Sequence, residues 1–283
     1  MPIAPKDFTL ITMVKIDGKN YRAIISDVDG TLMGKDRTIS QEVKNSIRKL
    51  KTSNVTFLVA TGRNFYGLIK SACKELDLKA PQITAGGSEI VDPRTSEVIS
   101  AEYIPNNEIK RLFDLLVSKN VAFWIEKDFC VYTKDAQEYP SLGPSVYKKL
   151  SNIKLNNVPK LGILPVEDVQ IGEELEIRLK AEFKGLHVTK SFSPQGRTWD
   201  ITGAMGNKQE AVLKVSRLLG IPTQEIIGIG DGYNDFPLLE ACGYKVAMDN
   251  ANPELKEIAD IVIPSLDQDG VAVFINKLLE SKN

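Results

Sequence analysis

Two stretches of this chain alternate short apolar runs with helical patterns, and that alternation limits the folds open to it. In the first stretch, the apolar runs 23–25 and 55–59 flank a segment whose hydrophobic residues recur at helical spacing behind Ser40, a candidate N-cap. From residue 198 the same rhythm returns and continues to the C-terminal helix. Buried strands that alternate with helices predict an α/β fold with a doubly wound, mostly parallel Rossmann-like sheet.

The segment between these stretches has a different pattern. Its strand candidates are more amphipathic and are mixed with helix candidates, which predicts an α+β module inserted into the first domain. A chain of 283 residues is long enough for two such parts. We expect an N-terminal extension at 1–20, a core domain from 21–87 and 193–283, and an inserted domain at 88–192.

Composition excludes several classes of partner. The formal net charge is −1 and the pI is near 6.0, so no global positive field attracts nucleic acid or a membrane surface. No apolar run approaches the ~18 residues of a membrane span, and residues 8–14 lack the features of a signal peptide. Cys73, Cys130 and Cys242 are widely spaced and predict buried thiols. The expected location is the cytoplasm, and the expected state is a monomer or a weak homo-oligomer.

Three polar clusters each follow a buried strand directly. They span Asp27 to Thr31, Thr61 to Arg63, and Gly230 to Asp235. Because ligands of open parallel sheets bind beyond the carboxyl ends of the strands, we expect the three clusters to converge in space. Their glycines let backbone N–H groups approach an anion closely.

The first cluster contains two carboxylates, Asp27 and Asp29. On one extended segment they would point the same way and repel each other, so the pattern favours a divalent cation between them or a shared proton. A hard cation such as Mg²⁺ suits oxygen ligands. His187, the one histidine, lies in a strand pattern without a partner signature and is expected to be structural. A carboxylate nucleophile with Mg²⁺ is the natural alternative to an imidazole base.

These motifs, in this order and spacing, resemble the haloacid dehalogenase superfamily of aspartyl-phosphate hydrolases, and most of all its Cof-type sugar phosphatase branch. The motifs are Asp-x-Asp-Gly-Thr-Leu from Asp27, Thr-Gly-Arg from Thr61, the lysine Lys208, and Gly-Asp-Gly-x-Asn-Asp from Gly230. In placement and size, residues 88–192 fit the α+β cap domain of that branch.

The resemblance implies a role for each matching residue. Asp27 would attack phosphorus and also ligate Mg²⁺. Asp29 would act as general acid and then as base, and would bind the metal through its backbone carbonyl. Asp231 would complete the metal site, with Asp235 in a supporting acidic position. The residues implied to hold phosphate are Val28 (through its backbone), Thr61, Gly62, Lys208 and Asn234.

Two motifs depart from the family pattern. The usual Asn-Gly at the first cap junction is Gly86-Gly87 here, and the usual Lys-Gly-x-Ala is Lys208-Gln209-Glu210-Ala211. Lys190 and Lys214 are rival cations for Lys208, although neither precedes the Ala-containing helix. Arg63 is assigned no chemical role.

The predicted function is a Mg²⁺-dependent phosphomonoesterase for a small phosphorylated metabolite, most simply a sugar phosphate, acting through an aspartyl-phosphate. The alternatives are a phosphomutase of the same superfamily and a non-catalytic protein that binds a phosphometabolite. Phe123 and Trp124 are expected in the core of the inserted domain rather than in a substrate pocket. The leaving group is left open, because its recognition depends on the inserted domain.

Overall fold

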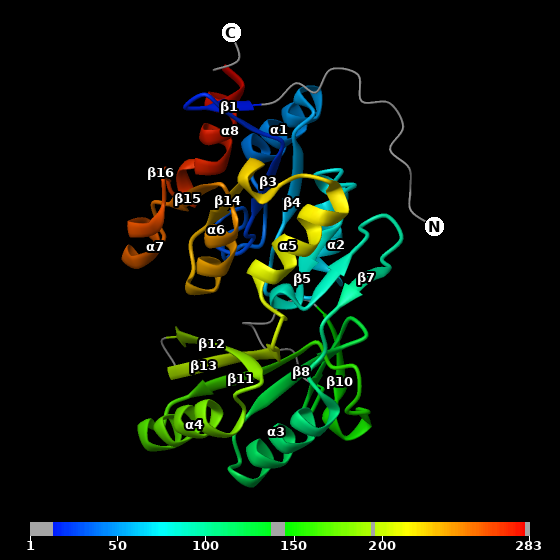
Figure 1. Cartoon of the computed structure of the whole chain (residues 1–283). Helices are drawn as coiled ribbons and strands as arrows, with labels where there is room; N and C mark the ends of the chain where they lie inside the picture. The colour runs from blue at the N-terminus through cyan, green and yellow to red at the C-terminus, as the bar shows by residue number, and fades with distance from the viewer. Residues whose placement is uncertain (1–13, 137–144, 194–195, 281–283) are drawn as a thin grey trace.

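The computed structural model describes residues 14–136, 145–193 and 196–280. A five-stranded parallel sheet, called the core sheet below, lies at the centre of one part of the molecule (Figure 1). In spatial order its strands are β16 (Ile261–Ile263), β15 (Tyr244–Met248), β14 (Ile226–Gly230), β3 (Ala23–Ser26) and β4 (Thr56–Val59). Every pairing is parallel, as the alternation of strands and helices predicts.

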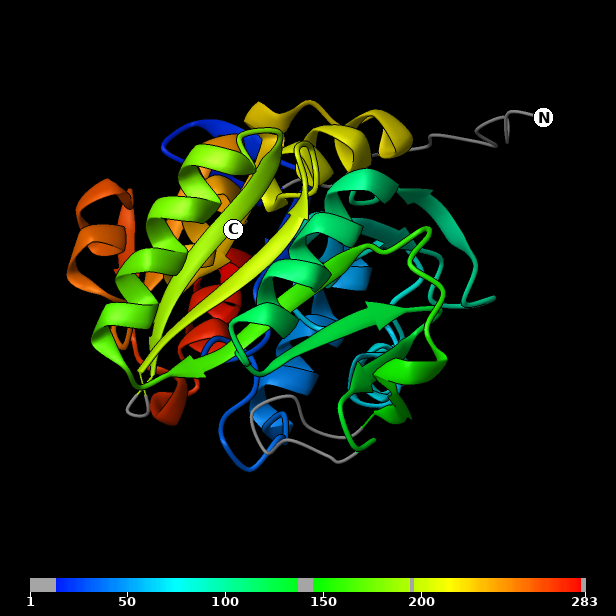
Figure 2. The same ribbon diagram turned by 90° about the horizontal axis from the view of Figure 1, so that it is seen from below.

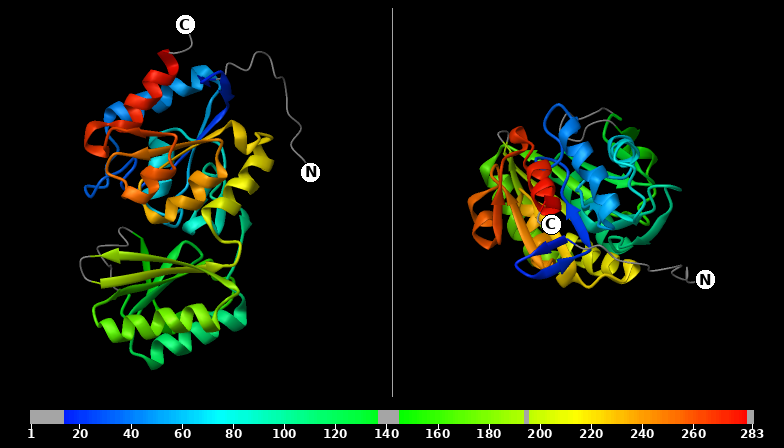
Figure 3. Two further views of the ribbon diagram at one scale, coloured as in Figure 1. Left: turned by 60° about the vertical axis from the view of Figure 1, so that its left-hand side comes forward. Right: turned by 90° about the horizontal axis from the view of Figure 1, so that it is seen from above.

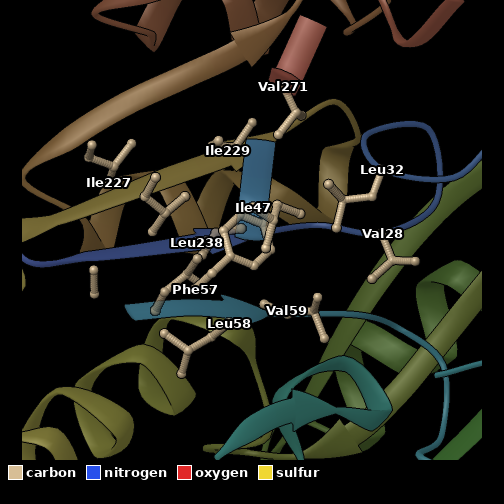
Figure 4. Packing of buried hydrophobic residues seen from close by; sticks show 14 of the residues in the cluster. Val28, Leu32, Ile47, Phe57, Leu58, Val59, Ile227, Ile229, Leu238 and Val271 are labelled. Atoms are coloured by element: carbon tan, nitrogen blue, oxygen red, sulfur yellow. The ribbon is translucent and has the colours of Figure 1, made fainter. Parts of the chain in front are cut away.

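Helices cover both faces of the core sheet (Figure 3). On one face α1 (Gln41–Leu50) packs beside α8 (Gly270–Glu280), and on the other α5 (Lys208–Leu219) packs beside α6 (Phe236–Ala241). The remaining helices of this part are α2 (Leu68–Glu75) and α7 (Pro253–Ile258). Apolar side chains from both sheet faces and the helices form one continuous cluster (Figure 4). The doubly wound α/β prediction is confirmed.

Local sequence signals set the helix ends. The Ser40 hydroxyl accepts a hydrogen bond of 3.1 Å from the backbone N–H of Val43, so Ser40 is the N-cap of α1. Gly220 ends α5 with a φ of 63°, a left-handed conformation that glycine adopts without steric cost. The described residues also form six short 3₁₀ turns: Lys51–Ser53, Ala85–Gly87, Leu150–Asn152, Thr223–Glu225, Tyr233–Asp235 and Leu266–Gln268.

Two small antiparallel sheets extend the core. A hairpin of β1 (Val14–Ile16) and β2 (Lys19–Tyr21) contacts α8, and its Val14 and Tyr21 side chains are buried. Residues 14–20 are therefore part of the packed structure, whereas 1–13 lie outside the described residues. A second small sheet joins β5 (Gln82–Thr84), β6 (Glu89–Val91) and β7 (Val98–Ala101).

A separate six-stranded mixed sheet, called the cap sheet below, forms the other part of the molecule. Its strands in spatial order are β10 (Val146–Lys149), β9 (Cys130–Thr133), β8 (Phe123–Lys127), β11 (Lys160–Val166), β13 (Gly196–Gly203) and β12 (Leu186–Ser193). Helices α3 (Asn106–Ser118) and α4 (Val169–Glu182) cover one face of it (Figure 2). The opposite face is turned toward the core sheet (Figure 1). The expected inserted α+β module is present.

The strand pairings at the two junctions bear on the expected bounds of the inserted domain, 88–192. Residues 89–91 pair with β5, and residues 98–101 pair in turn with 89–91, beside the core. Strand β13 belongs to the cap sheet rather than to the core. The apolar pattern of a strand is the same in either sheet, so the sequence alone does not assign it. We propose that the crossings lie at residues 102–103 and 204–207. There the two segments run close together, since a Cβ on Gly203 would lie 2.8 Å from the Tyr103 carbonyl oxygen.

The three cysteines are buried and unpaired, as expected. Among the described residues, no helix combines the length and apolar character that crossing a bilayer requires.

Candidate active site

Asp27 lies one residue beyond the end of β3, at the carboxyl edge of the core sheet. Its backbone N–H donates to the Ile229 carbonyl at 2.8 Å, so the parallel pairing with β14 continues into the first polar cluster. Only 4% of Asp27 is exposed. The short buried strand thus places the Asp27 carboxylate where little solvent reaches it.

Lys208 forms ion pairs with two of the acidic residues. Its ammonium nitrogen lies 2.6 Å from Asp27 Oδ1 and 2.6 Å from Asp235 Oδ1, and its side chain is 2% exposed. Burial alone lowers the pKa of Lys208, but the carboxylates of Asp235 and Asp27 outweigh it and raise that pKa overall. Lys208 is therefore held as a cation. The rival Lys190 instead lies 2.6 Å from Glu176 in the cap.

The start of α5 brings Lys208 to this position. Asn207 caps the helix by accepting a hydrogen bond of 3.0 Å from the Glu210 N–H. Gly87, with a φ of 106°, touches this helix start so closely that a Cβ would lie 2.2 Å from the Asn207 carbonyl carbon. The second glycine of Gly86-Gly87 is thus required by close backbone contact.

Three carboxylates form a cluster. Ligand oxygens of Asp27, Asp231 and Asp235 all lie within 4.8 Å of one another. Burial, and next the charge of Asp235, raise the pKa of Asp27 well above its usual range. Burial is also the main reason that the pKa of Asp231 rises to about 6. Two buried acids and the half-buried Asp231 carry excess negative charge beside one lysine, so the cluster is consistent with a divalent metal site.

Hydrogen bonds distinguish the members of the cluster. Asp235 is fully engaged, because its Oδ2 accepts from the backbone N–H groups of Asp231 (3.0 Å) and Gly232 (2.9 Å) while Oδ1 accepts from Lys208. Asp231 Oδ1 accepts from the Thr31 hydroxyl at 2.7 Å. In the part of the chain that the structure describes, no donor contacts Oδ2 of Asp27 or of Asp231. These two oxygens are free to hold a cation.

Asp29 lies in a different environment from Asp27. Strand β3 ends at Ser26 and the backbone turns, with the Leu32 N–H bonded to the Val28 carbonyl at 2.9 Å. The Asp29 carboxylate, 45% exposed, accepts three hydrogen bonds of 2.7–3.0 Å from Arg63. The assumption that both carboxylates point the same way is therefore wrong, because they do not share an extended segment. Arg63, which the sequence analysis left without a role, is the direct partner of Asp29.

The remaining predicted phosphate residues surround the same place. Thr61 is fully buried, and its hydroxyl accepts from the Arg63 N–H at 3.1 Å. The side chain of Val28 packs in the core (Figure 4), which leaves only its backbone for a ligand. Gly62 and Asn234 line one cavity together with Lys208.

The same cavity is lined from the cap side by residues that the sequence analysis did not select. They are Lys160, His187, Thr189, Asp200 and Thr202. His187 was expected to be structural, yet its ring contributes to a cavity that also contains Lys208. Polar and apolar residues alternate in β12 and β13, and this alternation predicts that each strand has one polar face. It does not indicate whether that face lies against solvent, a partner or the active site.

Comparison with known proteins identifies the family. The profile of the haloacid dehalogenase-like hydrolases matches residues 24–275. A 5-amino-6-(5-phospho-D-ribitylamino)uracil phosphatase of Bacillus subtilis is 29% identical, with 92% of this chain and 99% of that protein covered.

Solved structures agree on the fold. A protein of Thermotoga maritima is 26% identical with a TM-score of 0.77, covering 91% of this chain and 97% of its own. A subclass IIB sugar phosphatase of the superfamily is 21% identical with a TM-score of 0.75, covering 90% and 98%. The chain belongs to the haloacid dehalogenase-like hydrolase family and is a phosphatase of its Cof-type branch, as the motifs predicted.

Proposed function

We propose that this phosphatase is a Mg²⁺-dependent phosphomonoesterase that hydrolyses a small sugar phosphate through an aspartyl-phosphate on Asp27. The observation that supports it most is the placement of Lys208 between Asp27 and Asp235, beside a cavity that reaches the cap. A fixed cation next to a buried carboxylate neutralises charge where a phosphate dianion would enter.

The residues fit a divalent cation. Asp27 and Asp231 each keep one carboxylate oxygen free, and the backbone carbonyl of Asp29 is the third expected ligand. When bound, Mg²⁺ would offset the repulsion between the phosphate and the attacking carboxylate. Asp235 acts as a supporting residue, because its oxygens already hold Lys208 and two backbone N–H groups.

The proposed reaction has two steps. An Asp27 oxygen attacks phosphorus, the bond to the leaving oxygen breaks, and that oxygen takes a proton from Asp29. Water then attacks phosphorus, gives a proton back to Asp29, and releases inorganic phosphate as the Asp27 carboxylate is restored. Lys208 and the backbone around Thr61 and Gly62 would hold the phosphate during both steps.

The ion pair with Arg63 adds a condition to this scheme. Arg63 donates three hydrogen bonds to the Asp29 carboxylate, so both carboxylate oxygens are engaged in this structure. Asp29 must therefore release at least one of these hydrogen bonds when it protonates the leaving group. This requirement makes Arg63 a positioning residue for Asp29.

A phosphatase screen tests the function. The purified chain should release phosphate from sugar phosphates and from an aryl phosphate with Mg²⁺, and a chelator should abolish the release. Asp27→Asn should remove turnover on every substrate, whereas Asp77→Asn, which changes exposed ion pairs with Lys51 and Lys79, serves as the matched control. Absence of release from the whole panel would refute the proposal. Isomeric phosphorylated products without free phosphate would instead indicate a phosphomutase.

A further inference from the structure

The face of the cap sheet that is turned toward the core sheet carries an ordered polar surface. In the register across four neighbouring strands, His187 lies opposite Thr202, Thr202 opposite Lys160, and Lys160 opposite Glu126. Residues directly opposite in a sheet project on the same side, so these side chains form one row.

A second row runs beside the first. Thr189 lies opposite Asp200, Asp200 opposite Gly162, and Gly162 opposite Trp124. A Cβ on Gly162 would lie 2.1 Å from the Trp124 ring, so the glycine makes room for the indole. The tryptophan fills one end of the row, and the polar pair Thr189–Asp200 occupies the other.

The intervening residues project to the opposite face. Leu161, Trp199 and Ile201 belong to the apolar cluster beneath α3 and α4. This alternation gives the sheet an apolar side beneath α3 and α4 and a side toward the core that carries the two rows. The side toward the core also holds a small apolar cluster of Trp124, Val131 and Leu164.

The polar surface meets the catalytic residues at one cavity. Lys160 Nζ donates to the carbonyl of Gly62 in the core at 2.8 Å, and it lies 2.8 Å from Asp200 Oδ2. His187 Nε2 lies 3.2 Å from the Thr189 hydroxyl. Cap and core side chains therefore line one small cavity beside Lys208. The leaving group of a phosphate ester held by Lys208 would lie against these cap residues.

The charges in this space are balanced. Among the described residues that line the cavity, the two ammonium groups are Lys160, paired with Asp200, and Lys208, paired with Asp27 and Asp235. Burial lowers the pKa of His187, which keeps the imidazole neutral near pH 7. The described cap residues of this cavity thus offer neutral donors and acceptors and one carboxylate, but no unpaired cation for a second anionic group.

We propose that Thr189, His187 and Asp200 form a leaving-group subsite that selects uncharged, hydroxyl-bearing alcohols over leaving groups that carry a carboxylate or a second phosphate. The inference rests on the proposed function and names the residues that set its specificity. Hydroxyl groups of the substrate would hydrogen-bond to the Thr189–His187 pair and to Asp200, whereas a carboxylate there would face the Asp200 charge.

A matched pair of substrates tests the subsite. Glycerol phosphate and 3-phosphoglycerate differ only in that a carboxylate replaces a hydroxymethyl group. We expect the wild-type enzyme to prefer glycerol phosphate by about tenfold or more in kcat/KM. Equal values, a preference for 3-phosphoglycerate, or inactivity on both would overturn the subsite. Release of phosphate from an aryl phosphate in the same assay shows whether the proposed function survives that outcome.

Two variants assign the selection to the cap residues. Asp200→Asn leaves Lys160 without its carboxylate partner, so the preference for glycerol phosphate should fall about tenfold, in part through a gain on 3-phosphoglycerate. Thr189→Val keeps the side-chain shape and should lower kcat/KM for glycerol phosphate about fivefold relative to the aryl phosphate. Asp77→Asn should change neither ratio. A parallel change on all substrates, or no change, would refute the assignment even if Asp27→Asn abolishes turnover as expected.

Discussion

Replacing Glu126 by glutamine should stabilise the cap in a pH-dependent way. Glu126 is on β8 and is 5% exposed. In the described part of the chain, its Oε2 is buried without a hydrogen-bond partner. Burial, opposed by Lys160 and reinforced by Glu89, raises the pKa of Glu126 to about 8. Glutamine keeps the volume and removes the ionisation.

The magnitude follows from the two protonation equilibria. Below pH 4.5 the carboxyl of Glu126 is protonated in the folded and the unfolded chain alike. As the pH rises from 4.5 to about 8, the unfolded chain loses that proton while the folded chain retains it, so stability falls. The full difference corresponds to about 5 kcal/mol. Relaxation and water entry around a buried charge reduce such values, so we expect about 2–4 kcal/mol at pH 8.

Urea unfolding at several pH values measures this directly. The two tryptophans of the chain, Trp124 and Trp199, both lie in the cap sheet, so their fluorescence follows cap unfolding. Glu126→Gln should match the wild type near pH 4 and exceed it progressively toward pH 8. Glu257→Gln, at an exposed position of α7, is the control and should show no such trend. A variant that is less stable at pH 8, or a difference independent of pH, would show that Glu126 is ionised and paired in the folded chain.

Three further substitutions test the site. Asp29→Asn should lower kcat about 10²–10⁴-fold for alkyl phosphates and less for an aryl phosphate, whose leaving group needs little protonation; equal losses would exclude a general acid. Lys208→Met leaves the Asp27 carboxylate buried without its cation and should cost about 3–5 kcal/mol in thermal unfolding without metal, and an unchanged Tm would contradict the pairing. Gly30→Ala places a Cβ 2.2 Å from Asp231 Oδ2 at a φ of 87°, so it should raise the Mg²⁺ concentration for half-maximal activity at least about tenfold; an unaltered Mg²⁺ requirement would remove Asp231 from the metal site.

The sequence predicts those parts of the site that follow from strand order. Asp27, Asp231 and Asp235 follow the adjacent strands β3 and β14, and parallel strands necessarily bring their carboxyl ends to one edge. Lys208 was chosen for its position at a helix start, and it does reach Asp27. These contacts depend on topology, which short apolar runs and turn residues indicate well.

The direction in which the Asp29 side chain points could not be predicted in the same way. Its orientation depends on whether the strand ends one or two residues earlier, because each residue added to an extended segment reverses the side-chain direction. The chain turns at Val28, and the carboxylate meets Arg63 instead of the acidic cluster. Strand ends are the least certain feature of a sequence pattern, so the pairing with Arg63 required coordinates.

The cap residues show a second limit of prediction from sequence. His187 and Thr189 alternate with Leu186 and Val188, which is the pattern of a strand with one buried face. That pattern is compatible with solvent, a partner or a substrate on the polar side. Only the register with Thr202 and its neighbours shows that residues distant in sequence form one surface beside the active site.

The two faces of the cap sheet also explain why substitutions in the proposed subsite should leave the fold intact. The apolar face provides the packing with α3 and α4, and its residues alternate with those of the polar face along every shared strand. A substitution at Thr189 or Asp200 therefore leaves the buried cluster intact, while it alters the charge or hydrogen bonding opposite Lys208. In the proposed reaction the core sheet holds the nucleophile Asp27 and the cap sheet selects the leaving group, so the two tasks are assigned to separate sheets that meet at one cavity.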